Sequence, residues 1–220
     1  MNVIQKIASY FYPIKIHQMP SERSGALEVT LVNGKLVIDS ENANYSYGSL
    51  QKVLKKGLLQ FDAEKLQQCK NILILGVAGG SIIETLQADF KLKDAQITGV
   101  EIDKEVLTLA NTYFKINKKP NVKLVCEDAF EFVKTTNQTY DLIVIDIFND
   151  SKMPTSLFDY SFWNKIHNTL PNNGLCLFNS ISTSNNCIER NNKLFKQIQP
   201  KFTQVTRKKT AINELFVLVK

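Results

Sequence analysis

The chain has 220 residues, of which 44% are hydrophobic and 22% are charged, and no tract of biased composition interrupts it. This composition is typical of a globular protein and excludes an extended disordered chain. The length allows one well-buried α/β core with at most a small appendage. No apolar run approaches the ~18 residues of a membrane span, and residues 1–12 lack a basic segment followed by a long apolar one. We therefore expect a cytoplasmic protein with no membrane partner.

The net charge is +6, and part of it comes from three short basic clusters within residues 52–56, 115–119 and 207–209. Clusters of this kind can follow a phosphate backbone, but these lie on separate predicted elements and have no interleaved aromatic residues. We interpret them as solvated surface and regard nucleic acid as an unlikely partner.

Cysteine and histidine spacing argues against a metal site. The four cysteines, at positions 69, 126, 176 and 187, are widely spaced and form no C-x-x-C pair, and the only histidines are His17 and His167. Neither a zinc site nor a disulfide framework is indicated. We expect reduced thiols and no bound metal.

The first part of the chain has the alternating pattern of β-strands. Residues 12–17 and 27–31 alternate between apolar and polar side chains, and a further strand pattern, residues 35–39, follows a turn. Asn33-Gly34 separates the last two of these segments and is a strong hairpin signal. Residues 42–46 are expected to form a polar loop. We predict a small N-terminal β-hairpin unit over residues 1–48 and a larger domain over residues 49–220.

After a helical pattern near residues 50–58, strand and helix patterns alternate from residue 71 onward. Such alternation predicts a parallel sheet with helices on both faces. The strands are expected at 72–75, 96–100, 122–125, 142–145 and 174–178, and the helices at 81–89, 104–115, 129–134, 157–169 and 189–198. Strand patterns 202–206 and 215–219 then follow with no helix between them, so the last strand must be antiparallel. The fold class is α/β, with a Rossmann-like, seven-stranded, mostly parallel sheet.

A glycine-rich turn follows the first strand of this sheet, in residues 71–81, NILILGVAGGS. Glycines there let the backbone approach a ligand, and free N–H groups at the helix start can bind polar or anionic atoms. Gly76, Ala78, Gly79 and Gly80 are therefore candidate nucleotide-binding residues. Many junctions of this type use glycine for steric reasons alone, so the motif by itself leaves both readings open.

Acidic residues follow the next three strands, at the edge where ligands bind in open α/β sheets. Glu101 lies 25 residues after Gly76, close to the spacing expected for an acid that binds ribose hydroxyls. Asp128 either caps the next helix or accepts a hydrogen bond from adenine, and it could do both. Asp146 begins a long polar loop and is the candidate general base for an incoming amine or hydroxyl.

From about residue 39 to its end, the chain resembles the spermidine synthases, which have the class I S-adenosylmethionine-dependent methyltransferase fold. Residues 73–81 look like the nucleotide loop of that family, with Ala78 where glycine is commoner. The segments 100–103 (VEID), 127–129 (EDA), 140–146 (YDLIVID) and 44–47 (NYSY) are similar to its ribose, adenine, catalytic and amine-pocket segments. The resemblance implies adenine binding near Asp128 and Ala129, with Asp146 and Tyr47 as catalytic residues.

The resemblance also implies the ligands and the assembly. We expect S-adenosylmethionine or its decarboxylated form as the donor, a small amine-bearing acceptor, and a homo-oligomer, most simply a dimer. The family has a second aspartate shortly after the catalytic one, where this chain has Asn149 followed by Asp150. These two residues are the candidate substrate-binding positions. Two alternatives stay open: a methyltransferase acting on another substrate, and a nucleoside-binding relative without catalysis.

Overall fold

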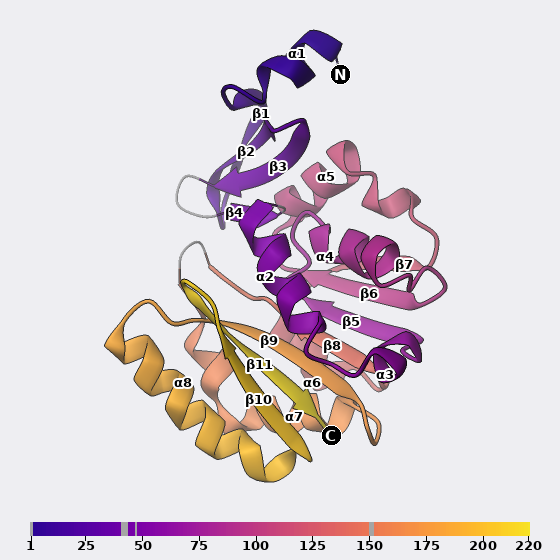
Figure 1. The fold of residues 1–220 in the computed structure, drawn as a ribbon, viewed down its shortest axis with the longest axis vertical. Coiled ribbons are helices and arrows are strands. Elements are labelled where there is room, and N and C mark those ends of the chain that lie inside the picture. Colours follow the sequence, from indigo (N-terminus) through magenta and orange to yellow (C-terminus); the bar gives the residue numbers. More distant parts are fainter. Residues whose placement is uncertain (1, 41–43, 47, 150–151) are drawn as a thin grey trace.

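The computed structural model describes residues 2–40, 44–46, 48–149 and 152–220. They form two sheets, a four-stranded N-terminal sheet and a seven-stranded main sheet. Figure 1 shows the N-terminal sheet at one end of the molecule, above the carboxyl-end edge of the main sheet. The main sheet carries helices on both faces, as the sequence predicts.

The N-terminal sheet is antiparallel and follows the short helix α1 (Val3–Ala8). Its strands are β1 (Ile14–Ser21), β2 (Gly25–Val32), β3 (Lys35–Ser40) and β4 (Asn44–Ser46). Asn33 and Gly34 have positive φ angles of 50° and 73°, which a two-residue type I′ hairpin requires. The predicted polar loop at 42–46 is wrong for residues 44–46, because β4 pairs with β3 through its backbone and needs no apolar pattern.

The main sheet has the strand order β10-β11-β9-β8-β5-β6-β7. The strands are β5 (Asn71–Leu75), β6 (Gln96–Glu101), β7 (Val122–Cys126), β8 (Leu142–Ile145), β9 (Leu175–Ile181), β10 (Gln204–Lys209) and β11 (Asn213–Val219). Strand β11 runs antiparallel to both β9 and β10, whereas β5 to β9 pair in parallel. The predicted seven-stranded, mostly parallel sheet is confirmed.

The helices differ from the prediction in some details. They are α2 (Gly48–Leu58), α3 (Ala63–Gln67), α4 (Ser81–Glu84), α5 (Lys104–Tyr113), α6 (Ala129–Thr135), α7 (Tyr160–Thr169) and α8 (Asn185–Ile198). The helix expected at 81–89 changes after one turn into a π-helical turn, Thr85–Asp89. The helix expected at 157–169 begins only at Tyr160, after a 3₁₀ turn. No helix of the described residues is long and apolar enough to span a membrane.

Two apolar clusters fill the space on either side of the main sheet. Leu54 and Leu58 of α2 pack on one face together with side chains of β5 and α4. Trp163 of α7 and Leu194 of α8 pack on the other face. In Figure 1, α2 accordingly crosses in front of the sheet while α6, α7 and α8 lie behind it. Because both faces are covered, the central strands are apolar throughout.

The N-terminal sheet is attached to the main domain through α5. Leu27, Val29 and Ile38 of the small sheet pack against Val106 and Leu109 of that helix. The N-terminal sheet is too small to form a core of its own, and this contact lets it cover an apolar surface of α5.

A buried carboxylate strengthens the same contact. Asp103 is the N-cap of α5, and its Oδ1 accepts hydrogen bonds from the backbone N–H groups of Glu105 and Val106. Its Oδ2 accepts from the hydroxyls of Ser21, at 2.5 Å, and Ser24, at 2.6 Å. Burial alone would raise the pKa of Asp103, but these hydrogen bonds outweigh burial and lower it.

Replacing Asp103 should therefore destabilise the whole chain. We expect Asp103→Ala to lower the free energy of unfolding at neutral pH by roughly 2–4 kcal/mol, from the lost cap and the unpaired serines. Asp62→Ala removes an exposed helix cap and should cost only about 1 kcal/mol. Denaturant unfolding measures both values.

The pH dependence gives a second check on Asp103. Because the folded pKa is lowered, the stability that Asp103 contributes is present above the ordinary aspartate pKa and is lost at lower pH. The difference between parent and variant should shrink in acid. A difference that stays constant down to pH 3 would contradict the role of the ionised carboxylate.

Candidate functional site

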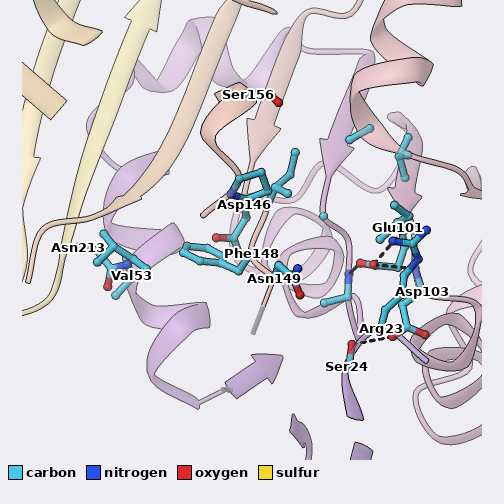
Figure 2. A pocket seen from close by; sticks show the side chains of 18 of the residues that line it. Arg23, Ser24, Val53, Glu101, Asp103, Asp146, Phe148, Asn149, Ser156 and Asn213 are labelled. Carbon is cyan, nitrogen blue, oxygen red and sulfur yellow. Dashed lines mark hydrogen bonds between the residues drawn. The ribbon is translucent and has the colours of Figure 1, made fainter. Parts of the chain in front are cut away.

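A cavity of about 1220 Å³ lies at the carboxyl ends of the central strands. Its walls come from the ends of β5, β6, β7 and β8, from the turn between β1 and β2, from α2, and from the turn between β10 and β11. Figure 2 shows Glu101 and Asp103 at one end of this cavity, Asp146 and Phe148 in the middle, and Val53 with Asn213 at the other end. We call these the Glu101 end and the Val53 end.

The glycine-rich turn supplies only part of the cavity wall. Gly76 and Ala78 line the cavity, whereas Gly79 and Gly80 do not. Gly76 has φ 83°, and a Cβ there would collide with the backbone carbonyl of Asp146. Gly80, with φ 81°, starts α4, and a Cβ there would strike Ile116. The steric explanation therefore holds for Gly76 and Gly80, and Gly76 also borders the cavity.

Glu101 is buried at the end of β6 and holds the turn in place. Its Oε2 accepts a hydrogen bond from the N–H of Ala78 at 3.0 Å, and its Oε1 accepts from Ile102 at 2.9 Å and Asp103 at 3.2 Å. Burial raises its pKa, although these backbone donors act in the opposite direction. A carboxylate has roughly four lone-pair positions. Three donors therefore leave room for one more, on the side of the cavity.

Asp128 caps α6, as one of the two predicted roles requires. Its Oδ1 accepts hydrogen bonds from the N–H groups of Phe130, at 2.7 Å, and Glu131, at 3.3 Å. Asp128 and Ala129 both line the cavity. The second carboxylate oxygen is not used in the cap, so one side chain can cap the helix and bind a ligand as well.

Asp146 follows β8 and lies in the wall between the two ends of the cavity. Its Oδ1 accepts a hydrogen bond from Nδ2 of Asn179 at 2.8 Å. Burial raises the pKa of Asp146 to about 7; the nearby carboxylate of Glu101 also raises it, whereas the bond from Asn179 lowers it. A carboxyl group with a pKa near 7 can exchange a proton at neutral pH, which suits a general base.

The remaining predicted positions lie in loops. Tyr47 and Asp150 fall outside the described residues. Asn149 lines the cavity and forms an isolated bridge with Lys152, in which each backbone N–H donates to the other residue's carbonyl. Phe148 precedes it and lies next to Asp146 (Figure 2).

Asn179, Arg23 and Ser24 are among the contributors to the site that the sequence patterns did not reveal. Asn179 is fully buried in β9, and its Oδ1 has no hydrogen-bond partner within the described part of the chain. An asparagine directly after the apolar run of residues 175–178 is a signal that could have found it. Arg23 and Ser24, in the turn between β1 and β2, line the Glu101 end. Nothing in a local pattern links that turn to a cavity near Glu101.

No group of three or more His, Cys, Asp or Glu residues in the described ranges is placed to hold a metal ion. The carboxylates Glu101, Asp128 and Asp146 that line the cavity each have their own hydrogen-bond partners. This arrangement can bind hydroxyl and amino groups and can exchange a proton at Asp146.

Comparison with known proteins identifies the family. The family model described as "Spermine/spermidine synthase domain" matches residues 51–217, which is most of the chain. The chain belongs to the spermine/spermidine synthase family. The resemblance inferred from the nucleotide loop and the acidic segments is thus confirmed.

The curated relatives of this spermine/spermidine synthase family member align with about half of its residues or fewer. The polyamine aminopropyltransferase of Vibrio vulnificus is 31% identical over 118 residues, 52% of this chain and 39% of that protein. The one of Alkaliphilus metalliredigens is 32% identical over 48% of this chain and 38% of its own length. An eEF1A lysine and N-terminal methyltransferase homologue of Drosophila melanogaster is 33% identical over 86 residues, 38% of this chain and 12% of that protein. The match thus spans less than half of each relative.

Solved structures share the fold over a larger part of the chain. Spermidine synthase from Thermotoga maritima has a TM-score of 0.69 at 17% identity, covering 94% of this chain and 73% of its own. Human methyltransferase-like protein 13 in complex with SAH has a TM-score of 0.64 at 19% identity, covering 78% and 82%. At such identities the likeness establishes a methyltransferase-like fold alone.

Asn179 should control the proton affinity of Asp146. We expect Asn179→Ala to raise the pKa of Asp146 further above its ordinary value, because the hydrogen bond to the ionised form is lost. A ¹³C NMR titration of the aspartate carboxyl groups measures this pKa. The exposed Asn168 offers a control, since Asn168→Ala should leave the titration unchanged. An unchanged Asp146 titration in Asn179→Ala would show that the bond has no electrostatic effect.

Proposed function

We propose that this chain is a group transferase with an adenosyl-sulfonium donor, S-adenosylmethionine or its decarboxylated form, and that it moves a methyl or aminopropyl group to a small amine-bearing acceptor. The observation that carries the proposal is Asp146, a carboxyl group with its pKa raised to about 7, between the two ends of one cavity. Membership of the spermine/spermidine synthase family supports it.

The Glu101 end is suited to the nucleoside of the donor. Glu101 has one lone-pair position left after its three backbone donors, and a ribose hydroxyl can donate to it. Asp128 has a carboxylate oxygen outside the helix cap, and an adenine amino group can donate to it. The solved spermidine synthase in complex with the transition state analogue AdoDATO, with a TM-score of 0.71 at 16% identity, is a neighbour with an adenosyl-type ligand.

Asp146 acts on the acceptor in this proposal. The amine nitrogen attacks the carbon bonded to the sulfonium, the carbon–sulfur bond breaks with its electrons going to sulfur, and Asp146 receives the proton released by the amine. The protein need not activate a sulfonium further, so its task is to align the amine and keep it unprotonated. Tyr47 would form a wall of the acceptor pocket, and Asn149 and Asp150 would contact the acceptor.

A methyltransferase with a different substrate is the second candidate. It is favoured by the match to the Drosophila methyltransferase homologue and by Asn149, which stands where the family has a second aspartate. A chain that binds adenosyl ligands without turnover is the third. Analysis of the sulfur product separates them, because methyl transfer yields adenosylhomocysteine and aminopropyl transfer yields methylthioadenosine.

Donor binding should depend on Glu101. We expect Glu101→Ala to weaken the binding of S-adenosylmethionine and of the uncharged methylthioadenosine by about 1–3 kcal/mol, because a ligand hydroxyl loses its charged acceptor. Isothermal titration calorimetry measures both affinities, and the exposed Glu64 offers the control Glu64→Ala. Parent-like affinity in Glu101→Ala would place the donor elsewhere.

Turnover should depend on the ionisation of Asp146. We expect kcat/KM to fall as the pH drops below about 7, because the protonated carboxyl group cannot accept a proton. Asp146→Asn should lower kcat by about 10²–10⁴-fold and abolish this acidic limb. The exposed Asp94 provides the control Asp94→Asn. Full activity of Asp146→Asn on any acceptor would remove the proposed base.

We also propose that the chain forms a dimer through its N-terminal helix. Ile4, Ile7 and Phe11 are 72%, 59% and 83% exposed, and apolar side chains gathered on one short segment favour association. Light scattering should give a dimer for the parent and a monomer for Ile4→Asp with Ile7→Asp. A monomeric parent would refute this association.

A further inference from the structure

Basic side chains gather at the Val53 end of the cavity. Lys52 and Lys56 are one turn apart on α2, and both line the cavity beside Val53. A second cavity of about 330 Å³ adjoins this end, and its wall adds Lys208 and Lys209 of β10. The two cavities share Lys56, Thr210 and Ala211 among their lining residues, so the four lysines lie along the walls of two adjoining cavities.

The charges of these lysines are not neutralised within the described part of the chain. All four side chains are exposed, and none lies within 4.0 Å of a carboxylate oxygen there. Their neighbour Lys55 differs, because its Nζ lies 2.8 Å from Asp89 and it does not line the cavity. Four unpaired cations along the walls of adjoining cavities produce a positive potential that attracts anions.

Carboxylates line the Glu101 end and the middle of the cavity, away from the lysines at the Val53 end. Those that line the cavity are Glu22, Glu101, Asp103, Asp128 and Asp146. The described positions at the Val53 end contribute threonine, asparagine and apolar side chains besides the lysines. Asn149 is neutral as well. The charge thus changes sign along the cavity, from negative near Glu101 to positive beyond Phe148.

We propose that the acceptor is a small molecule with an amine at one end and an anionic group, a carboxylate or a phosphate, at the other, an inference that rests on the proposed function. The amine lies at Asp146, a short carbon chain passes Phe148 and Val53, and the anion binds Lys52 and Lys56, with Lys208 and Lys209 in the adjoining cavity. Lysine ammonium groups form charge-assisted hydrogen bonds with such anions.

The same charges disfavour a diamine. The remote ammonium of a bound diamine would lie among four cations, and like charges held near one another repel. An acidic macromolecule would use the same lysines, but then the binding energy would come from many phosphates or carboxylates and not from one small acceptor. The apolar side chains of Phe148 and Val53, which line the cavity between Asp146 and the lysines, suit the short carbon chain of a small molecule.

The experiment compares acceptors of matched length. 4-Aminobutanoate, O-phosphoethanolamine and putrescine are titrated by calorimetry into the protein saturated with methylthioadenosine, and turnover is assayed with both sulfonium donors. We expect one of the two anionic amines to bind at least tenfold more tightly than putrescine, and which of them does so distinguishes carboxylate from phosphate. The double variant Lys52→Gln with Lys56→Gln should weaken that binding about tenfold or more. In turnover it should raise KM with kcat nearly unchanged, whereas Lys55→Gln should match the parent.

Each outcome bears on one proposal. Putrescine binding as tightly as both anionic amines, or a double variant equal to the parent, overturns the anionic acceptor. Tight binding of an acidic peptide or of RNA, with no binding of the small anionic amines, overturns it in favour of a macromolecule. Failure of methylthioadenosine to bind overturns the proposed function instead, and titration of the same amines into the protein alone still tests the lysine site.

Discussion

The close approach of two strand ends organises this molecule. The N–H of Asp146 donates to the carbonyl of Leu75 at 2.9 Å, and the N–H of Gly76 donates to the carbonyl of Val100 at the same distance. Only a residue without a Cβ fits at Gly76, because a side chain would strike the backbone of Asp146. This contact brings the ends of β5, β6 and β8 together, where the strand order of the sheet reverses. Ligand sites form at such points in open α/β sheets.

The same contact places several carboxylates in a small volume, and each has a different environment. Glu101 and Asp103 are both buried and accept hydrogen bonds from backbone or serine donors, but these bonds outweigh burial only at Asp103. Burial raises the pKa of Asp146 to about 7, and the negative charge of Glu101 adds to this effect, whereas the hydrogen bond from Asn179 opposes it. Hydrogen bonds to the ionised form thus oppose the effect of burial on each carboxyl group. The pKa values of Glu101 and Asp146 are raised, because burial dominates at both.

Local patterns predicted the main sheet and the β2–β3 hairpin of the N-terminal sheet well because their signals are local. The apolar run of β5, the Asn33-Gly34 turn and the missing helix before β11 each determine geometry over a few residues. The cavity residues that follow β6, β7 and β8 were found for the same reason, since the ends of parallel strands share one edge. Strand β4 was missed because its pairing depends on the backbone of β3 and not on its own side chains.

The rest of the cavity could not be predicted, because it depends on contacts between distant segments. Ser21 and Ser24 bond to Asp103, which is about 80 positions away in the chain. These hydrogen bonds hold the turn that contains Arg23 at the Glu101 end of the cavity, and Asp103 lies two positions after Glu101, which accepts a hydrogen bond from the glycine-rich turn. The N-terminal sheet is therefore part of the cavity wall and more than an appendage. A change that loosens the sheet would also loosen the cap of α5 and the turn after β6, so folding of the small sheet and formation of the Glu101 end of the cavity are coupled through Asp103.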